Sequence, residues 1–267
     1  MKYLGAKMLV YLFFVSCVSD EERRLQTDQS FEGEEMFNIS YSLDENIPYA
    51  FQPFEYYQDT LNYSEIPGCP EIELKEEINQ VKLLFGNPEC PTNLTEKKGV
   101  IIMTYLDSLS QENRFIRMEY EDYQVRGVKL KGNRFVEVDS VSPGIYQDRI
   151  SDLIMEDAHQ SSSKINANFT HQIIFTDSLQ QIMTSGYASG RNLAGRLFEM
   201  EILQDKLFLW DCVRNGFNVA TSGEESWNFK RTHEVDVRHR INYLEDPECN
   251  HIASIGLDDG REINKTQ

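Results

Sequence analysis

The sequence predicts a mainly β protein built on an antiparallel sheet with one or two short helices. Apolar and polar residues alternate along many short stretches, which is the pattern of half-buried strands. Turn-forming residues separate these stretches. Strands do not alternate with long helices, as they would in a parallel sheet. In 267 residues, an apolar fraction of 40% is enough to build a core.

Residues 1–19 have the layout of a signal peptide. Lys2 and Lys7 precede Met8–Val15, an unbroken apolar run that is too short to span a bilayer, and small residues suited to cleavage follow. We therefore expect a secreted, extracellular protein without a transmembrane segment. The alternative is a bacterial lipoprotein box at Cys17, in which the cysteine is kept and acylated, but Phe14 fits the first position of that box poorly.

The rest of the chain divides into three regions. Residues 20–66 read as an acidic leader, extended or disordered, because acidic residues recur there without a period and Pro48 and Pro53 oppose a helix. A propeptide or an acidic contact arm is the alternative for this region. Residues 67–252 are predicted to form the antiparallel β domain, and residues 253–267 a tail.

The two helices are expected at residues 70–85 and 146–158. In the first segment, Leu74, Ile78, Val81 and Phe85 repeat at helical spacing, and Gly86 follows the run. The second segment shows a similar spacing of apolar residues.

A β-hairpin is predicted from residues 100–105 and 114–120. In the second strand, Ile116, Met118 and Tyr120 share one face and charged residues occupy the other. Asn215-Gly216 is the strongest hairpin signal and should link residues 207–213 to 217–221. Alternation from Trp227 to Val237 predicts one long strand.

The formal net charge of −18 excludes a simple electrostatic partnership with nucleic acid, whose phosphates would be repelled. Such a charge suits a cation binder or a protein with a basic partner. Calcium is the candidate cation, at Glu119–Asp122 or Asp258–Asp259, but neither stretch has the spacing of an EF-hand loop, and a solvated acidic face is the competing interpretation. No other cofactor is expected.

No catalytic motif is present, so an enzyme is not expected and a secreted hydrolase is the weakest alternative. The chain lacks Gly-x-Ser-x-Gly and His-Glu-x-x-His. His233 and His239 would share a strand face but lie too far apart to hold one metal ion directly.

Four cysteines remain after the signal peptide: Cys69, Cys90, Cys212 and Cys249. An even number in a secreted chain predicts two disulfides, with three connectivities open. Five Asn-x-Ser/Thr triplets predict a glycoprotein. They begin at Asn38, Asn62, Asn93, Asn168 and Asn264.

An antiparallel sheet with large inward side chains can enclose an apolar pocket. The candidate lining residues are Ile116, Met118, Phe135, Ile174, Phe198, Met200, Phe208, Trp210 and Trp227. A filled core would use the same residue types, so periodicity does not separate the two interpretations.

The first hairpin resembles the opening of the ependymin-related domain, a family of secreted glycoproteins. The resemblance is carried by Cys90-Pro91, Leu94, Gly99, Tyr105–Asp107 and Arg114–Glu119. Weaker similarities are Cys212-Val213, Trp227, Asp246-Pro247 and Cys249, so the resemblance covers residues 90 to 250. One cysteine usual in the family is missing, and Cys69 and the acidic leader are additional.

The resemblance implies a strongly curved antiparallel sheet, a half-barrel like that of bacterial lipoprotein carriers, with an apolar pocket and a helical lid. It also implies calcium binding, non-enzymatic binding of a ligand or lipid, and homodimers. The family pattern would pair Cys90 with Cys212, which leaves Cys69 for Cys249.

We therefore expect a secreted non-enzymatic glycoprotein that binds an apolar, lipid-like small molecule in a curved β-sheet pocket. The alternative is an extracellular matrix or interaction glycoprotein with an acidic cation-binding surface and no pocket.

Overall fold

The computed structural model describes residues 19–87, 89–90, 96–107, 113–139, 142, 144–175, 179–231, 236–244, 249 and 252–266. The helices are α1 (Ser19–Glu45), α2 (Phe54–Gln58) and α3 (Trp210–Arg214), with 3-10 turns η1 (Ile47–Phe51), η2 (Thr60–Glu65) and η3 (Glu76–Ile78). No helix among the described residues is long and apolar enough to cross a membrane. The predicted signal peptide lies almost wholly outside these residues.

The prediction of a mainly β protein is confirmed, because fourteen antiparallel strands form one sheet among the described residues. The strands of its first half are β1 (Glu71–Lys75), β2 (Gln80–Phe85), β3 (Lys97–Asp107), β4 (Asn113–Val125), β5 (Val128–Lys131), β6 (Asn133–Asp139) and β7 (Ile145–Glu156). Those of its second half are β8 (Ser162–Phe175), β9 (Leu179–Arg191), β10 (Leu197–Leu209), β11 (Ser222–Lys230), β12 (Asp236–Leu244), β13 (Ile252–Gly256) and β14 (Glu262–Thr266).

The order of strands in the sheet follows the chain, so β1 and β14 are its edges. Only β6 leaves this path, because β5 and β6 both lie between β4 and β7. The β4–β5 turn is Arg126-Gly127, whose φ angles of 50° and 78° suit a two-residue type I′ hairpin. The predicted pairing of β3 with β4 is confirmed, and Ile116, Met118 and Tyr120 are buried on one face.

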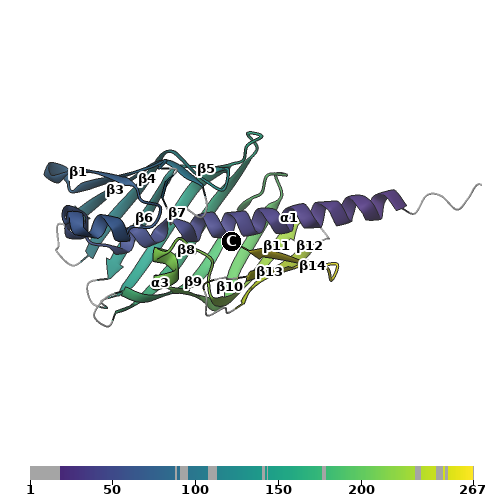
Figure 1. Ribbon diagram of the computed structural model, residues 1–267. Helices are drawn as coiled ribbons and strands as arrows, with labels where there is room; N and C mark the ends of the chain where they lie inside the picture. Colours follow the sequence, from purple (N-terminus) through teal and green to yellow (C-terminus); the bar gives the residue numbers. More distant parts are fainter. Residues whose placement is uncertain are drawn as a thin grey trace, which may run out of the picture.

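Helix α1 lies along the inner face of this sheet, and its first turns project beyond it (Figure 1). Lys97 on β3 contacts Glu45, whereas Lys265 on β14 contacts Glu34, eleven residues earlier in α1. Those eleven residues span about 17 Å of helix. In a flat sheet the ten steps from β3 to β14 would span about 48 Å. The sheet must therefore bend around α1, although the likeness to a lipoprotein-carrier half-barrel stays a prediction.

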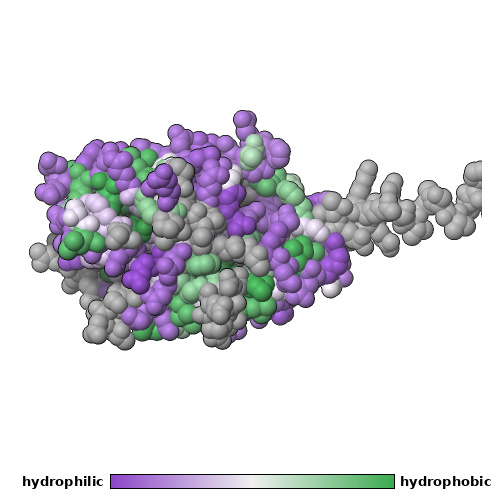
Figure 2. All heavy atoms as spheres, viewed as in Figure 1, coloured by the Kyte–Doolittle hydropathy of each residue, from purple (hydrophilic) through white to green (hydrophobic). Residues whose placement is uncertain are grey.

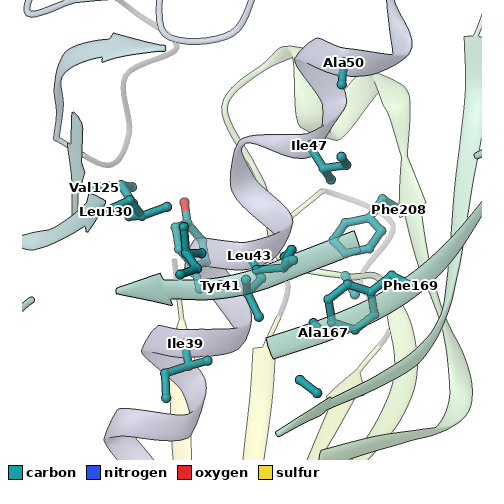
Figure 3. Packing of buried hydrophobic residues seen from close by; sticks show 14 of the residues in the cluster. Ile39, Tyr41, Leu43, Ile47, Ala50, Val125, Leu130, Ala167, Phe169 and Phe208 are labelled. Atoms are coloured by element: carbon teal, nitrogen blue, oxygen red, sulfur yellow. The ribbon is translucent and has the colours of Figure 1, made fainter. Parts of the chain in front are cut away.

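The core lies between α1 and the sheet. Every residue from 35 to 51 except Asn38 is buried. Ile39, Tyr41 and Leu43 of α1 pack among sheet residues that include Ala167 and Phe169 (Figure 3).

The predictions for residues 20–66 and 253–267 are wrong. The acidic leader is α1 followed by η1, α2 and η2, and the tail contributes β13 and β14 to the sheet. Periodicity missed α1 because several positions on its buried side are charged rather than apolar, as described below.

Both predicted sheet-covering helices are strands. Residues 71–85 form the β1–β2 hairpin, where Val81, Leu83 and Phe85 alternate with less buried residues. Residues 145–156 form β7, in which the register shifts between Ile150 and Leu153. Such a bulge buries two residues three positions apart, and this spacing imitated a helix.

Two turn predictions are also wrong. Asn215-Gly216 ends α3: the amides of Gly216 and Phe217 donate to the carbonyls of Val213 and Cys212, which is a Schellman motif. The stretch from Trp227 to Val237 is not one strand, because Lys230 at the end of β11 pairs with Asp236 at the start of β12. His233 lies outside the described residues. Asp258–Gly260 form the turn between β13 and β14.

The docking of α1 should dominate stability. Phe37→Ala removes a side chain that is 1% exposed, so we expect a loss of about 3–5 kcal/mol in the free energy of unfolding. Phe31→Ala, at a 50% exposed position of the same helix, should change it by less than about 0.5 kcal/mol. Urea unfolding measures both, and equal losses would contradict the inserted helix.

Candidate functional site

Charged side chains are buried along the interface between α1 and the sheet. Helix α1 contributes only acids to it, and the sheet and its turns contribute most of the cations. The acids are Glu32, Glu35, Asp44 and Glu45. Each of the four has partners on elements far away in the chain, and with the group around Arg134 the interface divides into five contact groups.

Arg134 of β6 contacts the last turn of α1. Its Nε and Nη2 donate to the Asp148 carboxylate at 2.9 and 2.6 Å, and its Nη1 donates to the Leu43 carbonyl at 2.7 Å. Burial alone would raise the pKa of Asp148, but the Arg134 charge and the hydrogen bonds outweigh it and keep that pKa below its usual value. His171 lies 3.5 Å from Asp148 and 2.8 Å from the Thr184 hydroxyl, and burial lowers the pKa of its imidazole.

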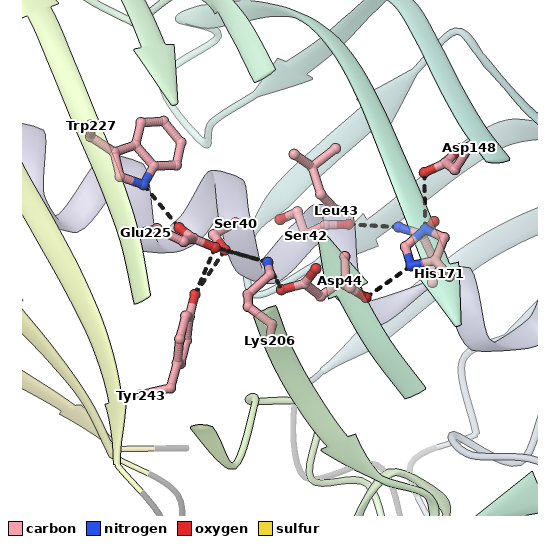
Figure 4. A network of polar contacts seen from close by, with 12 residues as sticks. Ser40, Ser42, Leu43, Asp44, Asp148, His171, Lys206, Glu225, Trp227 and Tyr243 are labelled. Atoms are coloured by element: carbon pink, nitrogen blue, oxygen red, sulfur yellow. Dashed lines mark hydrogen bonds and ion pairs between the residues drawn. The ribbon is translucent and has the colours of Figure 1, made fainter. Parts of the chain in front are cut away.

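Lys206 of β10 lies between two carboxylates (Figure 4). Its Nζ is 2.6 Å from Asp44 and 2.8 Å from Glu225, and Glu225 also accepts hydrogen bonds from Ser40 and Trp227. One cation does not neutralise two buried acids. Burial, together with the Glu225 charge and despite Lys206, therefore raises the pKa of Asp44 to about 6.

The C-terminal end of α1 is held by Glu45. Its carboxylate contacts Lys97 Nζ at 2.5 Å and accepts a hydrogen bond from the Tyr123 hydroxyl at 2.5 Å. Lys97 also donates to the Tyr49 hydroxyl at 3.2 Å. Burial and the Glu45 charge raise the pKa of both tyrosines, so both hydroxyls stay protonated donors.

Glu32 lies in the earlier part of α1, at the other end of the interface. Arg196 and Arg231 each donate to its carboxylate at 2.6 Å. His239 Nδ1 accepts a hydrogen bond from the Asp258 amide, so Nε2 carries the proton. Nε2 lies 3.2 Å from Glu32 Oε2 and donates to it. Burial would raise the pKa of Glu32, but these three partners lower it.

Glu35 is the exception, because no cation faces it among the described residues. Its Oε1 accepts from Ser163 at 2.7 Å and from the Leu193 amide at 2.6 Å, whereas Oε2 has no hydrogen-bond partner in the same part of the chain. Burial raises its pKa.

The hydrogen bonds among these buried groups resemble those of catalytic sites, but the groups are not accessible to a substrate. Thr184, His171 and Asp148 are linked like a nucleophile, base and orienting acid, and Lys206 lies 3.3 Å from the Ser40 hydroxyl. All five side chains are covered: Thr184 and His171 are each 1% exposed, and Ser40 is 0% exposed. A substrate has no route to them, so we interpret these contacts as structural.

Sequence reasoning missed this whole set of residues. A signal was present, because the charges stand two positions from apolar residues on the same strand. Arg134 precedes Val136, Asp148 follows Tyr146, and Lys206 precedes Phe208 in this way. A charge in the inward register of a strand marks a buried partner.

The predicted pocket on the inner face is filled. Seven of the nine candidates belong to the hydrophobic core: Ile116, Met118, Phe198, Met200, Phe208, Trp210 and Trp227. Phe135, 43% exposed, and Ile174 lie in the outward register of β6 and β8, so their assignment to the inner face is wrong. The side chains of α1 take the space that a ligand was expected to occupy.

An apolar crevice remains where η1 ends and α2 begins. Its volume is about 490 Å³. Residues of η1 and the segment after it form one wall, and β3, β4, β6 and β7 form the other. The lining includes Phe51, Phe54, Tyr105, Leu106, Arg114, Phe115, Ile116, Val138 and Tyr146. Of the predicted pocket residues, Ile116 lines it. Hydrophobic residues gather on this end of the molecule, near β1 (Figure 2).

The four cysteines form two disulfides, as predicted, but the pairing that the resemblance implied is wrong. Cys69 pairs with Cys90 and Cys212 with Cys249. The first bond closes the β1–β2 hairpin, and the second ties α3 to the segment before β13. Loops of 21 and 37 residues constrain the unfolded chain by about 3–4 kcal/mol each.

The predicted glycosylation sites differ in accessibility. Asn168 on β8 and Asn264 on β14 are exposed. Asn38 is partly buried on α1, and Asn62 donates a hydrogen bond to the Tyr56 carbonyl. Asn93 lies outside the described residues.

The carboxylates of the two predicted calcium stretches do not gather into a metal-binding group among the described residues. Among the described residues, no group of three His, Cys, Asp or Glu side chains could hold a metal ion. In the first predicted stretch, Glu119 pairs with Arg117 and Asp122 with Lys129. In the second, Asp258 accepts from the Arg238 amide and Asp259 pairs with Arg261.

The chain matches no protein-family model, no curated protein and no solved structure. The resemblance to the ependymin-related domain therefore stays a prediction.

Breaking the central buried ion pair should be costly. Arg134→Ala leaves Asp148 buried without its cation, so we expect a loss of about 3–5 kcal/mol in unfolding free energy. Arg149→Ala breaks an exposed pair with Glu137 on the same sheet and should cost at most about 1 kcal/mol. Similar losses of unfolding free energy in the two variants, measured with urea, would show that the buried pair is no more important for stability than the exposed one.

Asp44→Asn should change how stability depends on pH. Because the folded-state pKa of about 6 lies above the ordinary 3.8, the folded state binds the proton more tightly, and this carboxyl favours folding increasingly as pH falls from about 7 to about 4. The introduced amide resembles the protonated form of the carboxyl. The variant should exceed the wild type in unfolding free energy at pH 8, by up to roughly 3 kcal/mol, and converge with it near pH 4.

Unfolding measured between pH 4 and 8 tests this expectation. Parallel stability profiles for the two proteins would refute a raised pKa at Asp44.

Proposed function

We propose that the protein is a secreted, non-enzymatic glycoprotein that binds an apolar ligand carrying an acidic head group, such as a fatty acid. The crevice beside η1 is the observation that carries this proposal. Its volume of about 490 Å³ lies in the range of small-molecule sites, and its walls are mainly aromatic and aliphatic.

The chemistry of the crevice suits an amphipathic molecule. Phe54, Tyr105 and Phe115 offer apolar walls for a hydrocarbon chain. The crevice is lined by two charged residues, Glu55 and Arg114, and the guanidinium group of Arg114 suits a carboxylate ligand. A ligand that is apolar at one end and anionic at the other would satisfy both features.

The two disulfides support an oxidising compartment, in keeping with the predicted signal peptide. The closure of the buried polar groups under α1 supports a binding role rather than catalysis. A homodimer, expected from the family resemblance, remains part of the proposal and can be measured by sedimentation.

The second candidate is an interaction glycoprotein without a ligand pocket, and the filled inner face favours it. It predicts calcium-dependent self-association, which sedimentation with calcium and with a chelator would reveal. Unchanged sedimentation in the two conditions would count against this candidate.

Native mass spectrometry of the secreted protein should show co-purified lipid, and a fluorescent fatty acid should bind. Leu106→Asp places a charge at the crevice and should weaken binding about tenfold or more, since burying a charge beside an apolar chain is costly. Leu203→Asp, at a similarly exposed position on β10, is the matched control and should leave binding unchanged.

Arg114→Ala tests the contribution of the ligand's acidic head group separately from that of its hydrocarbon chain. It should weaken binding of the fatty acid but not of the corresponding fatty alcohol, which carries no charge. A ligand-free mass together with no uptake of either probe would overturn the proposal.

A further inference from the structure

The outer face of the sheet carries a row of polar residues that face one another across the strands. Asn168 of β8 pairs in register with Tyr187 of β9, Tyr187 with Glu201 of β10, and Glu201 with Ser226 of β11. Because side chains of directly paired residues point to the same face, this row forms a continuous strip across four strands.

A groove of about 690 Å³ runs along this strip. Tyr187, Ser189, Glu199, Glu201, Ser226 and Asn228 line it. The Tyr187 side chain is 57% exposed, so its ring offers an open surface to a ligand. The groove combines this aromatic face with hydroxyl, amide and carboxylate groups and with the guanidinium group of Arg238.

This combination suits a carbohydrate. The ring offers an apolar surface to the C–H face of a sugar, and the surrounding groups both donate to and accept from sugar hydroxyls. A hydrocarbon chain would leave these polar groups without partners, and the two glutamates, which outnumber the single cation Arg238, would repel a nucleic acid or another polyanion.

The carbohydrate that fits best is one carried by the chain itself. Asn168 begins the triplet Asn168-Phe169-Thr170, is exposed and pairs in register with Tyr187 of the groove. Its Nδ2 donates to the Tyr187 hydroxyl at 3.2 Å. An amide nitrogen carries two hydrogens, so one can keep this hydrogen bond while the other is replaced by a sugar.

We propose that Asn168 carries an N-linked glycan and that this glycan lies in the outer-face groove, against the Tyr187 ring. The proposal rests on the proposed secretion of the chain but not on its ligand. With the glycan in place, the exposed ring and the polar strip are covered.

Attachment is a glycosyl transfer from a glycosyl pyrophosphate donor. The bond from the sugar C1 to Nδ2 forms and the C1–oxygen bond to the pyrophosphate breaks. The amide proton is lost to solvent, and the pyrophosphate leaves with the bonding electrons. No oxidation or reduction takes place.

Asn264 supplies the matched comparison. It is exposed on the edge strand β14 and pairs in register with Ser254, which does not line the groove. A glycan there should extend into solvent, whereas one at Asn168 should be held on the protein surface.

The test uses full-length protein secreted from a glycosylating eukaryotic cell, with glycopeptide mass spectrometry before and after peptide N-glycosidase treatment. In the folded protein, the Asn168 glycan should be released about tenfold more slowly than in the unfolded protein, and more slowly than any glycan at Asn264. Tyr187→Ala should restore fast release. Tyr187→Phe, which keeps the ring, should retain slow release.

Asn168 without a glycan, or with one released at the same rate from folded and unfolded protein, would overturn the inference. The same holds if Tyr187→Ala leaves slow release unchanged. Secretion with Asn264 occupied and Asn168 bare would overturn this inference alone, whereas failure of the chain to enter the secretory pathway would overturn the proposed function as well.

Discussion

The structure depends on the insertion of one acidic helix into the bend of the sheet. Charges of α1 enter the protein interior because the sheet presents partners for most of them: Lys97 faces Glu45, and Lys206 faces Asp44. A buried ion pair adds little net stability when complete and costs several kcal/mol when one partner is lost. The contacts therefore act mainly on specificity, since only one position of α1 along the sheet gives each charge its partner.

The same contacts join the two ends of the chain. Ser40 bonds to Glu225, 185 residues later, and Glu32 contacts His239, 207 residues later. These contacts can form only after the last strands have been added to the sheet. Pairing over such separations carries a high loop-closure cost, so we expect slow folding in which α1 docks late.

Because α1 fills the inner face of the sheet, a ligand can bind only at other surfaces. The crevice lies between the sheet and the segment that joins η1 to α2. The groove over β9 to β11 lies on the opposite face of the sheet. Neither site requires α1 to move. Binding at these places can therefore coexist with a rigid core.

Sequence patterns determined a good part of this protein by themselves. Period-two alternation identified β4 and the inward face formed by Ile116 and Met118, and the even number of cysteines predicted two disulfides. These inferences succeeded because they depend on local geometry or on chemistry that any fold must respect. They failed where two local structures share one pattern, as at the β7 bulge and at Asn215-Gly216.

Only the tertiary structure decided what covers the inner face, which cysteines pair and which charges are buried. Alternation shows that Phe198 and Trp227 point inward, but it does not show whether a ligand, water or a helix meets them. Asp44 and Glu45 look like solvent-exposed acids until Lys206 and Lys97 are brought beside them by strands that follow much later in the chain. Such partners are set by the path of the chain in space, and a single sequence does not record that path.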